Sequence, residues 1–259
     1  MAGHVLPATQ TPTAPVRYHP PIMIADPTLL IPIDASAPED PPQALVDLLE
    51  PLHIVVLGHY PVPDQAAPQQ LQEAHEDEAK AAMEPIVRRF VEQGADVESV
   101  LVFTRDHVTS IDRVANEHDC DAVLVPGSVG DLSDVLVSLK DEQNMFRVLE
   151  VVGLLLEKTD PDVTLFHSES IERGSAISEL LLRGATDWLT ERGLDRGRIT
   201  WREPTAETQT TDLLELADEH DFVIMGEEEP SLAERVLGEL PDRIHARTGR
   251  AVLVVRRER

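Results

Sequence analysis

The sequence predicts an α/β protein built from two doubly wound, parallel-sheet domains in tandem, with the first domain cut short at its end. Short apolar runs alternate along the chain with longer segments whose apolar residues recur at helical spacing. This alternation is typical of parallel sheets, because a helix must return the chain before the next parallel strand can begin. The alternation also runs through the chain twice, which predicts the tandem.

The duplication is visible in two similar segments. Residues 114–119 read Val-Ala-Asn-Glu-His-Asp and residues 216–221 read Leu-Ala-Asp-Glu-His-Asp, an offset of 216 − 114 = 102 residues. Each segment ends a helical pattern and precedes an apolar strand. We therefore expect a first domain over residues 27–131 and a second domain over residues 132–259.

Residues 1–26 precede the first domain. They contain prolines at positions 7, 12, 15, 20 and 21 and show no periodicity, so we expect a flexible N-terminal arm. In the first domain, short apolar runs predict strands over residues 28–33, 54–57, 97–103 and 122–125. Apolar residues three or four positions apart predict helices over residues 41–52, 68–92 and 108–118.

The second domain repeats this order and continues further. The same patterns predict strands over residues 135–139, 163–166, 198–202, 221–226 and 251–255. They predict helices over residues 142–157, 174–192, 210–220 and 231–247. Only residues 131–134 separate the fourth strand of the first domain from the second domain, so we expect the first domain to lack its last helix and strand.

The charge of the chain narrows the choice of partners. Acidic residues outnumber basic ones 48 to 22, a net charge of −26, so nucleic acid and anionic membrane surfaces are poor partners. The only lysines are Lys80, Lys140 and Lys158, and aromatic residues are few. This composition indicates a halophilic surface, because in 1 M salt the Debye length is only about 3 Å and self-repulsion is screened. An ordinary acidic protein is the alternative.

Cysteine use and hydropathy point to a cytoplasmic protein. Cys120 is the only cysteine, so no internal disulfide can form, as expected in a reducing compartment. No stretch approaches the roughly 18 apolar residues of a membrane span, and the polar N-terminus has no hydrophobic signal core. We therefore expect no membrane insertion.

The chain resembles the universal stress protein family over residues 27–259, as two such Rossmann-like domains. Residues 30–36 read Leu-Ile-Pro-Ile-Asp-Ala-Ser, like the family's opening strand. Residues 217–226 read Ala-Asp-Glu-His-Asp-Phe-Val-Ile-Met-Gly, like its fourth strand and the helix before it. Residues 249–255 read Gly-Arg-Ala-Val-Leu-Val-Val, like its last strand. Each motif is weak by itself, but their order and duplication are specific.

The resemblance implies a test for nucleotide binding. In the family that the chain resembles, ATP-binding members carry Gly-x-x-Gly after the fourth strand and Gly-Ser or Gly-Thr nine residues later. An aspartate ends their first strand. Glycines let backbone N–H groups approach the phosphates. In the second domain Gly226 matches the first glycine, but the other positions depart from the pattern. Glu229 replaces the second glycine after Glu227 and Glu228, Gly238 comes one residue early, and Lys140 replaces the aspartate. Each carboxylate about 4 Å from a phosphate costs on the order of 1 kcal/mol in water, so we expect this half to reject a triphosphate. The glutamates also suit the start of a helix.

The first domain keeps more of the pattern. Asp34 ends its first strand, and Gly127, Ser128 and Gly130 match Gly-x-x-Gly, but residue 140 is lysine and the helix that should follow is missing. The resemblance implies a remnant adenine-nucleotide site at Asp34, Gly127, Ser128 and Gly130. The alternative, which we favour, is that the two glycines turn a linker between the domains.

These observations favour a regulatory protein that acts in a stress response through contacts with other proteins. We expect no catalytic residues, no metal site and no cofactor, and therefore not an enzyme. A small nucleotide hydrolase would need a metal-holding carboxylate beside an intact phosphate loop. The runner-up is an ATP- or AMP-binding stress sensor that uses the first domain, with ATP as the cofactor if that site is intact. We expect a homodimer, paired through residues 252–255, or an intramolecular pseudo-dimer.

Overall fold

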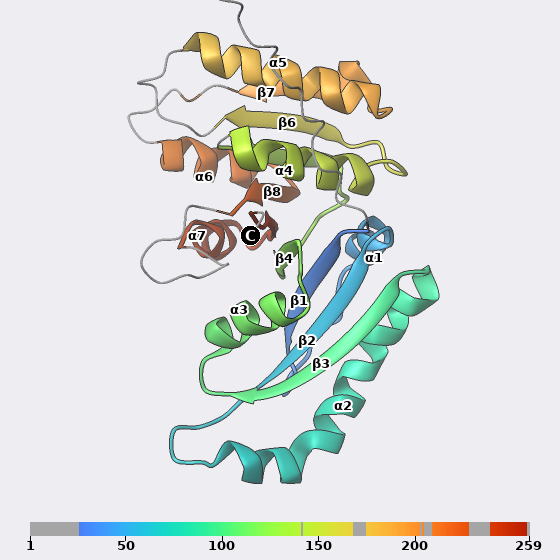
Figure 1. Cartoon of the computed structure of the whole chain (residues 1–259), viewed down its shortest axis with the longest axis vertical. Coiled ribbons are helices and arrows are strands. Elements are labelled where there is room, and N and C mark those ends of the chain that lie inside the picture. The colour runs from blue at the N-terminus through green and yellow to red at the C-terminus, as the bar shows by residue number, and fades with distance from the viewer. Residues whose placement is uncertain are drawn as a thin grey trace, which may run out of the picture.

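The computed structural model describes residues 26–140, 142–167, 175–202, 204, 209–227 and 239–257, which form one nine-stranded sheet with helices on both faces (Figure 1). The first half contains β1 (Thr28–Asp34), α1 (Gln43–Leu49), β2 (His53–Pro61), α2 (Pro68–Gln93), β3 (Asp96–Thr104), α3 (His107–Glu117) and β4 (Ala122–Val125). The second half contains β5 (Asp134–Leu139), α4 (Glu142–Leu155), β6 (Asp162–His167), α5 (Ser175–Glu191), the 3-10 turn η2 (Arg196–Arg198), β7 (Ile199–Arg202), α6 (Gln209–Glu219), β8 (Phe222–Gly226), α7 (Glu239–Thr248) and β9 (Ala251–Val255).

The helices and strands agree with the sequence prediction in type and order, and differ at their ends. α1 begins at Gln43 rather than at residue 41, after Pro41 and Pro42. Proline is tolerated at the start of a helix, where no backbone N–H is needed, but not in its interior. The predicted start of the last helix, residues 231–238, lies outside the described residues, as do residues 1–25 of the predicted arm.

The strand order shows how the two halves join. The order is β3-β2-β1-β4-β9-β8-β5-β6-β7, and every neighbouring pair is parallel except β4 and β9. These two strands are antiparallel, with Val123 opposite Val254 and Leu124 opposite Leu253. Residues 126–133, between β4 and β5, contain neither a helix nor a strand, so β9 takes the place beside β4 that a fifth first-half strand would fill. We expected a parallel sheet in each half, packed edge to edge as a pseudo-dimer or joined to a second copy. The structure joins the two halves into one sheet through β4 and β9.

This pairing corrects one expectation about assembly. We expected residues 252–255 to pair with a second copy of the chain. That prediction is wrong for this structure, because β4 of the same chain occupies that edge of β9. The outer edges of the described sheet are β3 and β7.

Two apolar clusters lie on the two faces of the sheet. One contains buried residues of α1, α2, α4 and α5, and the other contains buried residues of α3, α6 and α7. Successive residues of β1 alternate between them, with Leu29 and Ile31 in the first cluster and Leu30 in the second, as strand geometry requires. Helices on both faces explain why the strands read as continuous apolar runs.

The antiparallel joint also sets where ligands can bind. In open α/β sheets the ligand crevice lies beyond the carboxyl ends of the parallel strands. Because β4 and β9 run in opposite directions, the carboxyl ends of the first-half strands and of the second-half strands lie at opposite edges of the sheet.

No helix in the described part of the chain is long and apolar enough to cross a membrane.

Candidate functional site

The main candidate site is a cavity of about 470 Å³ at the carboxyl ends of β1 and β4. The strand order reverses between these two strands, which is where ligands bind in open α/β sheets. Six apolar side chains line the cavity: Ile31, Ile33, Leu45, Ile86, Phe90 and Leu124. Its other lining residues are Glu39, Asp40, Pro41 and Pro42 from the loop before α1, Pro126, Gly127 and Ser128 after β4, and His245 and Gly249 at the end of α7.

Gly127 and Ser128 line this cavity, but both serve the joint between the halves. A Cβ atom on Gly127 would lie 2.6 Å from the carbonyl carbon of Arg250, so only glycine lets the two backbones approach. Ser128 donates its N–H and its hydroxyl to the carbonyl oxygen of Gly249, at 2.9 Å and 3.2 Å. The Ser128 N–H is therefore already used within the chain.

Gly130 does not line the cavity, and it too has a structural role. Its φ of +52° lies in the left-handed region that favours glycine. A Cβ atom there would lie 2.3 Å from Asp221 Oδ1 and 3.2 Å from Arg250 Nη1, which themselves form an ion pair at 3.4 Å. The glycine therefore lets the linker pass against Asp221.

Asp34 lies at the end of β1, outside the residues that line the cavity. Its exposed carboxylate accepts the Ser36 N–H at 2.8 Å and the Ser36 hydroxyl at 2.6 Å. Partial burial raises the pKa of Asp34, but the hydrogen bonds from Ser36 and the charge of nearby His59 lower it further, and the net pKa is below its usual value. The pKa of His59 is also lowered, by burial and by repulsion from His107, although Asp34 opposes the shift.

The structure thus separates the four residues predicted for the first-half site. Gly127 and Ser128 lie at the cavity, while Asp34 bonds within its own turn and Gly130 packs against Asp221. The contacts of both glycines match the alternative that they turn a linker.

In the second-half crevice, at the carboxyl ends of β5 and β8, the side chain of Asn144 packs against Gly226. A Cβ atom on Gly226 would lie 2.5 Å from Nδ2 of the buried Asn144, which donates to the carbonyl oxygen of Val255 at 3.2 Å. A cavity lined by Gly226, Ser138 and Lys140, among other described residues, has a volume of about 90 Å³. Small-molecule pockets usually enclose about 300–1,000 Å³. The cavity formed by the described residues of this crevice is therefore smaller than an ordinary ligand site.

Glu227 is the one member of the glutamate triplet within the described residues. Its carboxylate accepts the Arg257 N–H at 2.9 Å, and its carbonyl oxygen accepts a hydrogen bond from Arg257 Nε at 3.2 Å. The side chain is thus tied to the end of β9. Glu228, Glu229 and Gly238 lie outside the described residues.

Sequence reasoning missed the residues that shape both crevices. Glu39, Asp40, Pro41 and Pro42 are consecutive and follow the first strand, a signal visible in the sequence that we assigned to a loop and a helix start. Asn144 gave no signal, because its position over Gly226 depends on how α4 packs on the sheet.

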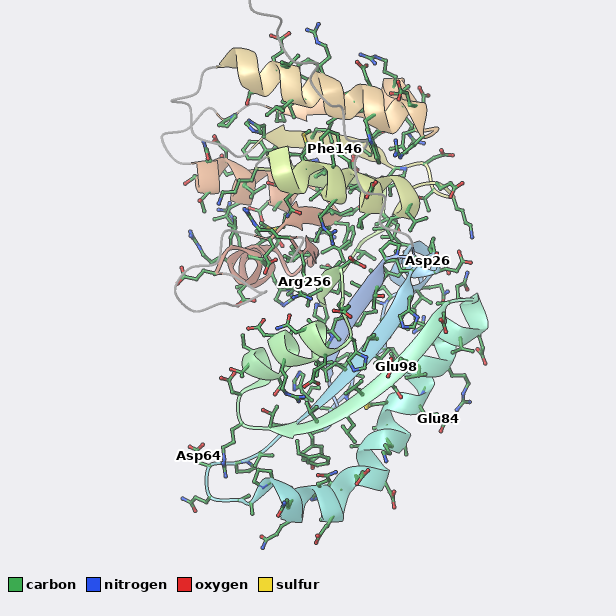
Figure 2. The ribbon with its side chains drawn as sticks, in the orientation of Figure 1. Asp26, Asp64, Glu84, Glu98, Phe146 and Arg256 are labelled. Carbon is green, nitrogen blue, oxygen red and sulfur yellow. The ribbon has the colours of Figure 1, made fainter. Side chains whose placement is uncertain are left out.

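A polar cluster connects the halves at the other end of the β4–β9 pair. Arg147 of α4 donates to Asp121 at 2.8 Å, and Asp121 also accepts the N–H of Thr28 at 3.0 Å. The buried Arg256 donates from Nη1 to the carbonyl oxygens of Ala115 and Cys120, at 2.8 and 2.7 Å, and so lies between α3 and the second half (Figure 2). Burial raises the pKa of Cys120 to about 12, which makes the thiol unreactive.

Asp121 has a structural counterpart in Asp221. Asp121 accepts the N–H of Thr28, which begins β1, and Asp221 accepts the N–H of Ser133, which precedes β5, both at 3.0 Å. The structural offset is 221 − 121 = 100 residues, two fewer than the 102 of the sequence repeat. The first half therefore has two extra residues between its helix and its strand.

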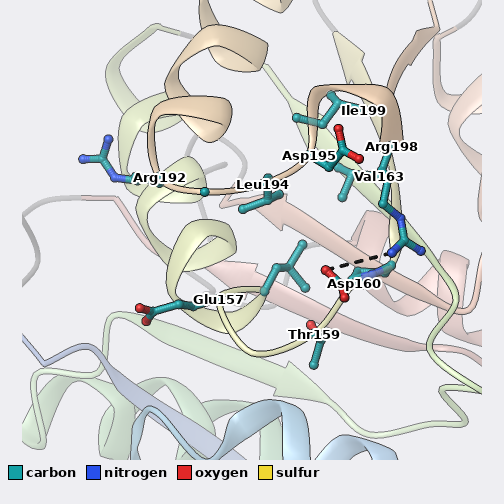
Figure 3. A pocket seen from close by; sticks show the side chains of 12 residues that line it. Glu157, Thr159, Asp160, Val163, Arg192, Leu194, Asp195, Arg198 and Ile199 are labelled. Atoms are coloured by element: carbon teal, nitrogen blue, oxygen red, sulfur yellow. Dashed lines mark ion pairs between the residues drawn. The ribbon is translucent and has the colours of Figure 1, made fainter.

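A third cavity, of about 280 Å³, lies at the amino ends of β6 and β7 (Figure 3). Arg198 crosses it and contacts Asp162 at 3.0 Å and Asp160 at 4.0 Å. The cavity is at the end of the strands where α/β sheets do not bind ligands. Among the described residues, no group of three or more His, Cys, Asp or Glu side chains is placed to hold a metal ion.

Comparison with solved structures identifies the fold. A universal stress protein from Archaeoglobus fulgidus superposes with a TM-score of 0.61 and 16% identity, over 89% of this chain and 96% of that one. A functionally unknown protein from Pseudomonas aeruginosa superposes with a TM-score of 0.51 and 12% identity, over 91% of this chain and 94% of that one. No protein-family model and no curated protein matches the sequence. The chain has the fold expected from the sequence.

Proposed function

We propose that this chain, which has the universal stress protein fold, belongs to that family and acts in a stress response through contacts with other proteins, without catalysis. It works in the cytoplasm and needs no cofactor. Two observations at the second-half crevice carry the proposal: the side chain of Asn144 packs against Gly226, and the cavity that the described residues line there has a volume of only about 90 Å³. The net charge of −26 adds long-range repulsion against a polyanion.

The outer edge of the sheet supports protein contacts. β3 is nine residues long, and the residues of its first part, including Glu98 and Ser99, are exposed. Edge strands present backbone groups that can pair with a strand of another protein.

Mass spectrometry of small molecules released from the protein tests the proposal. The protein is purified in high salt, denatured and filtered. We expect the molar ratio of released adenine nucleotide to protein to stay far below one. ATP, ADP or AMP near one molecule per chain would contradict the proposal.

The second candidate function is a nucleotide sensor that uses the first half. The cavity of about 470 Å³ favours it, because the volume suits a ligand and Gly127 and Ser128 line it. Substituting Gly130 is a poor test, since that residue supports the linker. Ile33→Trp fills the cavity instead, and Leu180→Trp, at a side chain that is 70% exposed, is its control. If this candidate is correct, wild type and the Leu180 variant retain nucleotide and the Ile33 variant loses it.

A further inference from the structure

We propose that the cavity at the carboxyl ends of β1 and β4 binds a small apolar molecule carrying an amine cation, and that it rejects phosphorylated ligands. This goes beyond the proposed function, which assigns no small-molecule ligand. The proposal is argued from the apolar walls of the cavity, from rim residues that offer no free hydrogen-bond donor, and from the acidic residues at the rim.

The walls suit an apolar body. The cavity of about 470 Å³ lies within the usual size of ligand sites, and side chains such as Ile33, Leu45 and Leu124 line it. Burying an apolar group against such walls is favourable in proportion to the area removed from water. A ring system or a branched aliphatic group fits this space.

Three residues of the described rim offer no free donor to a phosphate. Pro41 and Pro42 stand where the chain enters α1, and proline has no backbone N–H. On the opposite side, the N–H and hydroxyl of Ser128 both donate to Gly249. None of the described residues that line the cavity is a lysine or an arginine.

The rim instead carries acceptors. Glu39 and Asp40, two exposed acidic residues, line the cavity. Their negative charges attract an ammonium group at the rim and repel a phosphate.

Two fluorescent probes with the same body test the charge preference. We would measure the anisotropy of 1-naphthylmethylammonium and of 1-naphthylacetate with the full chain in 1 M KCl. At that salt the Debye length is about 3 Å, so the net charge of the protein contributes little and contacts at the site decide. We expect the ammonium probe to bind at least about tenfold more tightly.

Matched variants locate the preference. Glu39→Gln with Asp40→Asn keeps the shapes of two exposed side chains and removes their charges, and should bring the two probes within about twofold. Glu73→Gln with Asp77→Asn makes the same charge change on an exposed face of α2 and should leave the preference unchanged. Ile33→Trp should abolish binding of both probes.

Each other outcome counts against the proposal. The proposal is wrong if the ammonium probe does not bind, or if the acetate probe binds equally well or more tightly. It is also wrong if the Glu39 and Asp40 variant keeps the preference, or if the Ile33 variant binds the probes fully. ATP is titrated in the same experiment. Displacement of the ammonium probe by ATP would overturn both this proposal and the proposed function, whereas failure of the probe without ATP binding would leave the proposed function standing.

Discussion

At the scale of the residue, Gly127 and Gly130 show that one glycine motif can arise for two different structural reasons. Gly-x-x-Gly is compatible with a phosphate cradle and with a tight backbone crossing, because both need a position without a Cβ atom. Sequence could locate Gly127 and Gly130 but could not choose between these causes. The choice depends on Arg250 and Asp221, which lie more than 90 residues away in the chain.

Gly127→Ala tests the close approach of the backbones at Gly127 and Arg250. The added Cβ atom would lie 2.6 Å from the carbonyl carbon of Arg250. We therefore expect a loss of about 1–3 kcal/mol in the free energy of unfolding, measured in urea at constant salt. Gly184→Ala is the control, because nothing lies within 4 Å of its new Cβ atom in the middle of α5. We expect that variant to gain about 0.5–1 kcal/mol. Equal effects of the two substitutions would contradict the assigned role.

The single cysteine gives a second test at this scale. Burial raises the pKa of Cys120 from the usual 9.0 to about 12, so at pH 8 it holds roughly a thousandfold less thiolate than an exposed cysteine. We expect native protein to resist labelling by iodoacetamide at pH 8, and the unfolded chain in guanidinium chloride to take up one label. Because the thiolate is the reacting form, labelling should rise as the pH approaches 12. Rapid labelling of the folded protein at pH 8 would contradict the burial.

At the scale of the element, the antiparallel pairing of β4 with β9 organises the protein. Every strand of the described sheet was predictable from its apolar run, because such a run carries its own periodicity and boundaries. The partner of each strand was harder to predict. The short linker of residues 126–133 indicated the missing strand, but which strand replaces it depends on packing between halves.

The ion pair between Arg147 and Asp121 tests this joint. Its two side chains are 17% and 20% exposed and belong to different halves. A double-mutant cycle with Arg147→Met and Asp121→Asn should give a coupling energy of about 1–3 kcal/mol in urea unfolding. The control is the pair of Arg88 and Glu84 on α2, whose side chains are 56% and 65% exposed and whose expected coupling is about 0.3–0.5 kcal/mol. A coupling at the joint no larger than the control would contradict a close contact between the halves.

At the scale of the whole molecule, sequence reasoning predicted the fold and did not predict the shape of the site. The fold follows from periodic patterns that each segment carries in itself. The site depends on which side chains converge, and here the loop of residues 39–42, the linker at Gly127 and the end of α7 converge from distant parts of the sequence. The glutamate triplet drew attention to the second half, whereas the larger cavity lies in the first.

The pairing of β4 with β9 also predicts the assembly state. We expected the edge of β9 to form a dimer, but β4 of the same chain already pairs with it. Light scattering after size exclusion in 1 M KCl should give the mass of one chain, 28.6 kDa. A stable mass of twice that value would show that another surface, such as the edge strand β3, joins two copies.

Isothermal titration calorimetry of ATP into the full-length chain in 1 M KCl tests the central claim, that neither crevice accepts a polyanion. The small described cavity of the second-half crevice and the acidic rim of the first-half cavity predict no saturable heat up to about 1 mM ATP, a binding free energy weaker than about −4 kcal/mol. A micromolar dissociation constant with a stoichiometry near one would contradict the account.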